Sequence, residues 1–299
     1  MKFLDPKIDM AFKRLFGSED HKGVTISFLN TMLEYKGNKQ IESIQFMNNE
    51  QLPISPDKKE NILDLFCVDK NNRKFIVEMQ NARMAAFEKR ILFYGTKAYS
   101  NQLKAARPYT DLDPVTVVAI TKKFNVFPQK SHYKSIQHLV DSKTLEHDID
   151  DLTFAFIELP KFVKKEHELV TDEDKWLFLL KEISSYDHIP EPLKQSEFQE
   201  ACELLNQFTL SDYEQAVYEK KLLDAQAEEV REKEYSTIEL KAQKAREEGR
   251  KEGETKGRQE GETKGRLEIA KQLLDILDVA TIAQKTGLTI EQVEDLKKG

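Results

Sequence analysis

The chain has 299 residues, of which 39% are hydrophobic and 33% are charged, and its formal net charge is −7. This length allows one sizeable hydrophobic core with appended segments. The two cysteines exclude a disulfide framework, and no apolar run reaches the ~20 residues that a membrane helix needs. The opening MKFLDPKIDM also lacks the apolar region of a signal peptide, so we expect a cytoplasmic protein.

The charge is distributed unevenly along the chain. Residues 1–130 hold 21 Lys/Arg and 15 Asp/Glu, a net charge of +6, whereas residues 131–299 hold 25 and 38, a net charge of −13. The total of −7 argues against a generally basic nucleic-acid binder. The net positive charge of residues 1–130 favours a polyanionic substrate, although solvated surface charge explains this modest excess nearly as well.

Two helices and a strand are predicted at the start of the chain. An Asp-Pro pair and a later Gly bound a first helix over residues 5–17. Apolar residues favour a second helix over 23–33 and a strand over 41–47. Asp9 and Lys13 are four residues apart, which makes them neighbours on the first helix.

Residues 62–80, ILDLFCVDKNNRKFIVEMQ, indicate two strands joined by a polar turn. Asp64 and Glu78 interrupt the apolar runs of these strands. An ionised carboxylate in a dry core costs several kcal/mol unless it faces a cation. Because side chains alternate between the two faces of a strand, Glu78 and Gln80 share one face. Two carboxylates and a carboxamide together favour a hard divalent metal ion.

The turn length decides whether these groups meet. A two-residue turn pairs Asp64 with Met79 and separates the carboxylates across the sheet. A three-residue loop or a bulge pairs Asp64 with Glu78 or Gln80 and joins them on one face. A hairpin with one wet face also contains lone acidic residues, so the spacing alone leaves an ordinary solvated hairpin open.

The motifs together resemble a known family. An Asp, a hairpin and then Glu-x-Lys is the pattern of PD-(D/E)xK nucleases, and Asp64, Glu78 and Gln80 fit it with Gln in place of the usual Lys. The opening DPKIDMAFKRLFG, the IVEMQ strand and the late run of Gly-spaced charged residues resemble the Rpn family. These are recombination-promoting nucleases, also labelled transposases.

The resemblance implies a fold, an activity and a set of site residues. The fold is an α/β, restriction-endonuclease-like mixed sheet flanked by helices, with a helical C-terminal extension. The activity is hydrolysis of DNA phosphodiester bonds in recombination, mobile DNA or phage defence. Asp64 and Glu78 are implied to bind Mg²⁺ or Mn²⁺ and to act in catalysis with Gln80. Asp9, with Lys13 beside it, is implied to support the metal site.

After Gln80 the apolar spacing changes to that of a helix, which we expect over residues 83–104. Arg83, Lys89, Arg90 and Lys97 lie along it and are candidates for contacts with DNA phosphates. A solvated helix face explains any single one of these cations equally well.

The remaining part of the first domain alternates strands and helices. Continuous apolar runs predict buried strands over 115–120 and 154–159. Helices are expected over 175–184 and 197–208. Together with the hairpin, these elements predict a mixed α/β sheet.

The composition divides the chain into a nuclease-like domain over 1–210, a charged helical linker over 211–266 and a small segment over 267–299 that resembles a helix-turn-helix. Glycines recur every fourth residue in the linker, at Gly249, Gly253, Gly257, Gly261 and Gly265. This stripe favours either a homodimer packed through the helical region or a flexible spacer. A helix-turn-helix of this kind can bind a DNA groove, but because the last segment has few cations, a contact with another protein is an equal expectation.

Two classes of function follow from the sequence. The first is a metal-dependent DNA endonuclease built on Asp64, Glu78 and Gln80. The alternative is a catalytically weak or inactive nuclease-fold module that binds DNA or protein. A transposase with a separate Asp/Asp/Glu framework is disfavoured, because the sequence offers no such framework outside the hairpin.

Overall fold

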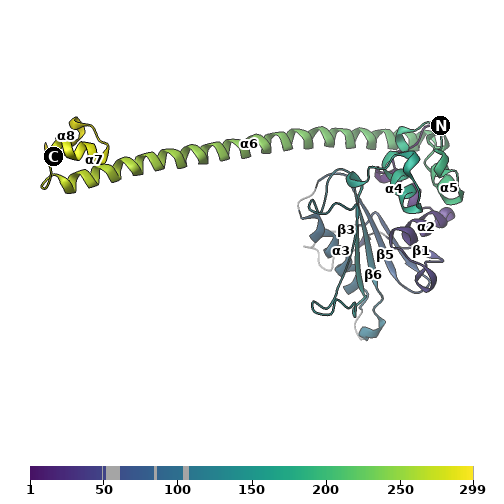
Figure 1. The fold of residues 1–299 in the computed structure, drawn as a ribbon. Coiled ribbons are helices and arrows are strands. Elements are labelled where there is room, and N and C mark those ends of the chain that lie inside the picture. Colours follow the sequence, from purple (N-terminus) through teal and green to yellow (C-terminus); the bar gives the residue numbers. More distant parts are fainter. Residues whose placement is uncertain (49, 52–60, 84–85, 104–107, 299) are drawn as a thin grey trace. The chain divides into compact units, whose positions relative to one another are not determined.

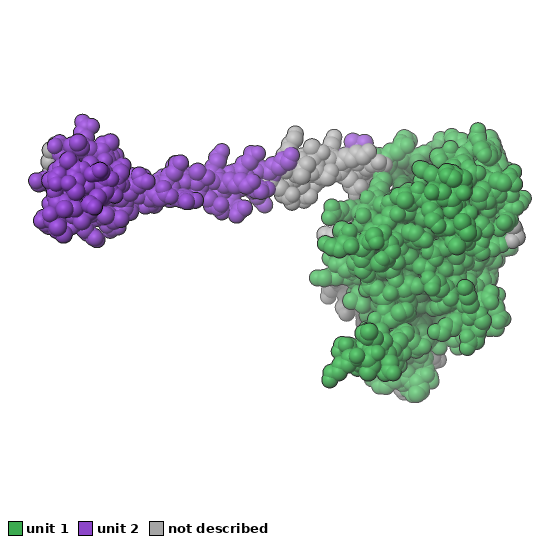
Figure 2. Space-filling model, viewed as in Figure 1, with its two compact units in different colours: residues 1–229 green, residues 230–299 purple. Residues whose placement is uncertain are grey.

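The computed structural model describes residues 1–48, 50–51, 61–83, 86–103 and 108–298. The chain forms two compact units, residues 1–229 and 230–299, which are coloured separately in Figure 2. The three-part division predicted from composition remains a proposal.

A mixed six-stranded sheet organises the first unit (Figure 1). Its strand order is β1-β4-β5-β6-β8-β7, in which β5, β6 and β8 run parallel and the other neighbours are antiparallel. The bounds are β1 Ile44–Phe46, β4 Leu65–Asp69, β5 Lys74–Gln80, β6 Val115–Thr121, β7 Lys134–His138 and β8 Leu152–Glu158. Two short strands, β2 Glu50–Gln51 and β3 Asn61–Ile62, pair separately. The central strands are apolar on both faces, because helices cover both sides.

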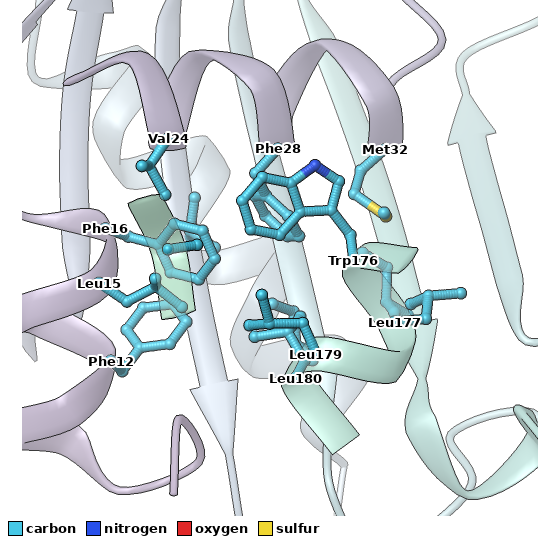
Figure 3. Close-up of a cluster of buried hydrophobic side chains, with 14 of the residues drawn as sticks. Phe12, Leu15, Phe16, Val24, Phe28, Met32, Trp176, Leu177, Leu179 and Leu180 are labelled. Carbon is cyan, nitrogen blue, oxygen red and sulfur yellow. The ribbon is translucent and has the colours of Figure 1, made fainter. Parts of the chain in front are cut away.

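Four helices pack on one face of the sheet: α1 Asp9–Phe16, α2 Lys22–Met32, α4 Asp172–Glu182 and α5 Ser196–Leu204. Trp176 of α4 is fully buried among them and packs against the rings of Phe16, Phe28 and Phe198 (Figure 3). This cluster continues into the side chains of β5 that point to the same face. These are Phe75 and Val77, with the partly buried Met79 against them.

A single helix, α3 Phe87–Ser100, covers the opposite face around the hairpin. Phe87, Ile91 and Tyr94 pack with Ile76 of β5. Gly95 allows the close approach of α3, because a Cβ at this position would lie 2.8 Å from the Phe154 ring. The helix therefore lies near enough for the side chain of Arg90 to approach Glu78 of β5.

The second unit has its own small core. Helix α6, Asp212–Leu273, leads into α7 Val279–Thr286 and α8 Ile290–Lys298. Ala270, Ile282 and Val293 are fully buried between these helices. Gly287 ends α7 with a φ of 70°, a left-handed conformation that favours glycine. A capping box opens α8: Thr289 N–H donates to Gln292 Oε1, and Gln292 N–H donates to Thr289 Oγ1.

The expected fold class, a mixed sheet with flanking helices and a helical C-terminal extension, is confirmed. Some boundaries differ from the predictions. The first helix begins at Asp9, because the Asp5 carboxylate accepts the Lys7 N–H in a turn instead of capping a helix. Strand β7 was not predicted, since its polar sequence lies at the sheet edge. Helix α3 ends at Ser100, and Lys104 lies outside the described residues. Within the described ranges, no helix is long and apolar enough to span a bilayer.

Candidate active site

The loop between β4 and β5 sets the register of the hairpin. Asp69 N–H donates to Arg73 O, which leaves three residues, 70–72, in the loop. Asn72 takes a φ of 61°, and the Asp69 carboxylate accepts the N–H groups of Asn71 and Arg73 at 2.9 Å each. Asn tolerates this left-handed conformation better than most residues. Of the two registers that the sequence allowed, the odd loop is therefore the one that forms.

This register places the two acidic residues opposite each other. Leu65 pairs with Val77, so the next residue outward, Asp64, lies across from Glu78. Two hydrogen bonds cross between the strands here: Asp64 N–H donates to Glu78 Oε1 at 3.1 Å, and Met79 N–H, next to Glu78, donates to Asp64 Oδ2 at 2.7 Å. Each carboxylate is thus fixed by a main-chain donor of the opposite strand.

The surroundings of the pair disfavour two negative charges. Glu78 is only 4% exposed, and burial together with the Asp64 charge raises its pKa to about 8. Burial also raises the pKa of Asp64, and the Asp9 charge acts in the same direction. Arg90 and Lys13 oppose both shifts without cancelling them. Two carboxyl groups held together in this way favour a bound cation.

Gln80 lies on the same face of β5 as Glu78, as the alternation predicted. Its Nε2 donates to Ala82 O at 3.0 Å, and its Oε1 accepts from Arg90 Nη1 at 3.3 Å. Arg90 comes from the inward side of α3, and its Nη2 lies 3.9 Å from Glu78 Oε2. The structure therefore joins Asp64, Glu78 and Gln80 with a cation from the next helix.

The comparison with protein families agrees with this arrangement. Residues 6–236 match the family described as PD-(D/E)XK nuclease family transposase. The chain belongs to this family. The matched range includes every predicted site residue and the whole six-stranded sheet. Comparisons with curated proteins and with solved structures found no match.

The residues proposed to support this PD-(D/E)XK site lie on α1. Asp9 and Lys13 form an i, i+4 ion pair of 2.9 Å, and both side chains are nearly half exposed. Their charges reach Asp64: Asp9 raises its pKa and Lys13 lowers it. Helix α1 thus adds one group of each sign near the carboxylates.

The four predicted phosphate contacts have different environments. Arg83 and Lys89 are exposed, Arg90 is turned toward Glu78 and Gln80, and Lys97 is 8% exposed on the inner side of α3. Arg83 and Lys89 are therefore the most exposed of these four cations, and Arg90 is partly exposed.

Sequence reasoning missed Tyr94 as a residue of the site. The Tyr94 hydroxyl accepts from Arg90 Nε at 2.5 Å, and the Arg90 guanidinium lies 5.0 Å from the Tyr94 ring centroid. The signal was an Arg and a Tyr four residues apart on one helix, which makes their side chains neighbours.

Proposed function

We propose that this protein is a metal-dependent DNA endonuclease that hydrolyses phosphodiester bonds. Family membership supports nuclease activity in general. The observation that carries the finer proposal is the pairing of Asp64 and Glu78, two carboxyl groups that each accept a main-chain N–H from the opposite strand. A structural role alone gives no reason to retain two carboxyl groups whose ionisation burial opposes.

The donor set fits a hard divalent cation. Carboxylate oxygens are the ligands that Mg²⁺ and Mn²⁺ prefer, and Mg²⁺ is commonly held by one or two carboxylates together with water and substrate phosphate. No group of three or more His, Cys, Asp or Glu suited to a metal is found in the described part of the chain. We assign Asp64 and Glu78 as the protein ligands because their carboxyl groups lie across from each other at the end of the hairpin. Bound Mg²⁺ or Mn²⁺ would polarise the scissile phosphate and lower the pKa of water.

The other residues of the site serve to orient and bind. Gln80 can accept or donate a hydrogen bond to the attacking water but carries no charge. Arg83, which precedes α3, and Lys89, in the first turn of α3, are exposed cations that would bind the DNA backbone. Asp9 and Lys13 adjust the charge at Asp64 from α1.

A second candidate function is a nuclease-fold module that binds DNA or protein without cutting. The Gln80 environment favours it, because the amide is already engaged by Ala82 O and by Arg90. In this reading the carboxylates hold a cation that only stabilises the fold or bridges to a phosphate.

Cleavage of supercoiled plasmid by the full chain in Mg²⁺ or Mn²⁺ separates the two functions. An endonuclease converts the plasmid to nicked and linear forms, and Asp64→Asn and Glu78→Gln abolish the conversion. A binding module shifts the plasmid on a gel but leaves it supercoiled. The Asn and Gln variants preserve side-chain shape, so their loss of activity reports on charge.

We also propose that the protein is a homodimer joined through its helical C-terminal region. Apart from the adjacent residues and the helix's own backbone, no described atom lies within 4 Å of a Cβ built at Gly249, Gly253, Gly257, Gly261 or Gly265. Glycine costs ~1 kcal/mol relative to alanine in a helix interior, and close packing against a second backbone offsets such a cost. The alternative is a spacer that tethers the small C-terminal core.

The biological setting of this activity is proposed from the family and the composition. A nuclease of a transposase family acts on mobile DNA, in recombination or in defence against phage. The cytoplasm suits both cysteines, which are buried and unbonded to each other.

A further inference from the structure

The candidate active site holds two acidic groups and a neutral amide where it must receive a phosphodiester. In the hydrolysis a water oxygen bonds to phosphorus, one P–O ester bond breaks, the water loses a proton and the leaving oxygen gains one. Negative charge gathers on the phosphate oxygens as this happens. Gln80 has no charge with which to offset it.

Arg90 is a cation that reaches this position from the protein. It approaches from α3, and its Nη1 lies 3.3 Å from Gln80 Oε1. Arg90 Nη2 lies 3.9 Å from Glu78 Oε2, which is longer than the 2.7–2.9 Å of a charge-assisted hydrogen bond. Arg90 is therefore not held as a tight ion pair of Glu78. Its side chain is 31% exposed, so the guanidinium borders both the carboxylates and solvent.

Tyr94 fixes the orientation of Arg90. Its hydroxyl accepts from Arg90 Nε, and the guanidinium also contacts the aromatic ring. Tyr94 itself is 4% exposed and belongs to the core under α3. A long side chain anchored at Nε loses little further entropy when its Nη groups bind a phosphate.

We propose that Arg90 contacts the scissile phosphate and supplies the positive charge that Gln80 lacks, with Tyr94 as its positioning residue. This inference rests on the proposed endonuclease function. The guanidinium presents donors in a planar fork that matches two phosphate oxygens. Its role differs from that of Arg83 and Lys89, which bind the backbone away from the reacting phosphorus.

The test compares kcat and KM for plasmid cleavage by the full chain and its variants. Arg90→Met removes the charge at similar length, and we expect kcat to fall about 10²–10³-fold with little change in KM, as for loss of one donor to a developing oxyanion. Lys89→Met, one residue away and exposed, is the matched control and should change KM more than kcat. Tyr94→Phe should lower kcat about tenfold, because Arg90 then loses its anchor.

A rescue experiment separates catalysis from folding. Because Gln80 Oε1 and Arg90 Nη1 are neighbours, an ammonium introduced by Gln80→Lys would occupy the same region. In the Arg90→Met background, we expect Gln80→Lys to raise kcat at least tenfold. A merely structural Arg90 predicts no rescue and a lowered melting temperature instead.

The outcomes distinguish the two proposals. An active wild type whose Arg90→Met variant stays within twofold in kcat, or is not rescued by Gln80→Lys, overturns the role of Arg90 alone. A wild type without Asp64-dependent cleavage overturns the endonuclease and this inference with it. Loss of kcat, intact folding and rescue by Gln80→Lys support it.

Discussion

Asp64 and Glu78 bind each other's strands: Asp64 N–H donates to Glu78 Oε1, and the Asp64 carboxylate accepts Met79 N–H. The same two bonds that close the end of the hairpin thus bring two carboxyl groups together. Substitution of either residue should therefore change both the stability of the protein and its activity.

Glu78 should make the stability of the metal-free protein depend on pH. Its pKa rises from 4.5 to about 8 on folding, through burial and the Asp64 charge. A raised folded pKa means that protonation favours the fold. The stabilisation of the fold by protonated Glu78 is complete below pH 4.5 and is lost as the pH rises toward 8. Glu78→Gln should therefore become more stable than wild type across this window, by on the order of a few kcal/mol at pH 9. Urea unfolding from pH 5 to 9 with chelator measures this, and a difference independent of pH contradicts it.

Asp64→Asn and Asp64→Ala should separate the hydrogen bond from the charge. Asn keeps a carbonyl oxygen for Met79 N–H, whereas Ala leaves that donor without its present acceptor. We expect Ala to be about 1–2 kcal/mol less stable than Asn, with both inactive. Thermal unfolding combined with the plasmid assay checks this. Equal stability of the two variants would mean that the 2.7 Å bond contributes nothing.

Binding of Mn²⁺ should release protons and tighten with pH. A cation displaces the proton that Glu78 holds below about pH 8, so affinity should rise by up to about tenfold per pH unit from pH 6 to 8 and then level off. Calorimetry in buffers of different ionisation enthalpy counts the released protons. Glu78→Gln should lose both the binding and its pH dependence. Retained binding in that variant would place the metal elsewhere.

Alanine substitutions in the glycine stripe should have opposite effects on helix stability and on dimer assembly. Gly253→Ala, Gly257→Ala and Gly261→Ala each raise helix stability by ~0.5–1 kcal/mol. If the stripe packs against a second backbone, the added methyl groups should nevertheless shift the protein from dimer to monomer. Light scattering measures the mass, with Gln259→Ala, exposed on the same helix, as the control. A full-length wild-type monomer identifies the segment as a spacer.

The sequence by itself determined the elements that carry the site. Alternation along β5 placed Glu78 and Gln80 on one face, because strand side chains alternate whatever the rest of the chain does. The apolar runs over 115–120 and 154–159 predicted buried strands, and the fold class followed from them.

Only the tertiary structure decided which groups meet. The turn residues allowed two registers, and the φ of Asn72 together with the bonds to Asp69 selects the one that joins Asp64 to Glu78. Arg90 was one of several equivalent cations in the sequence. Its role depends on how closely α3 packs on the sheet at Gly95 and on the Tyr94 hydroxyl. Such contacts join residues far apart in the chain or depend on packing depth, so local patterns do not encode them.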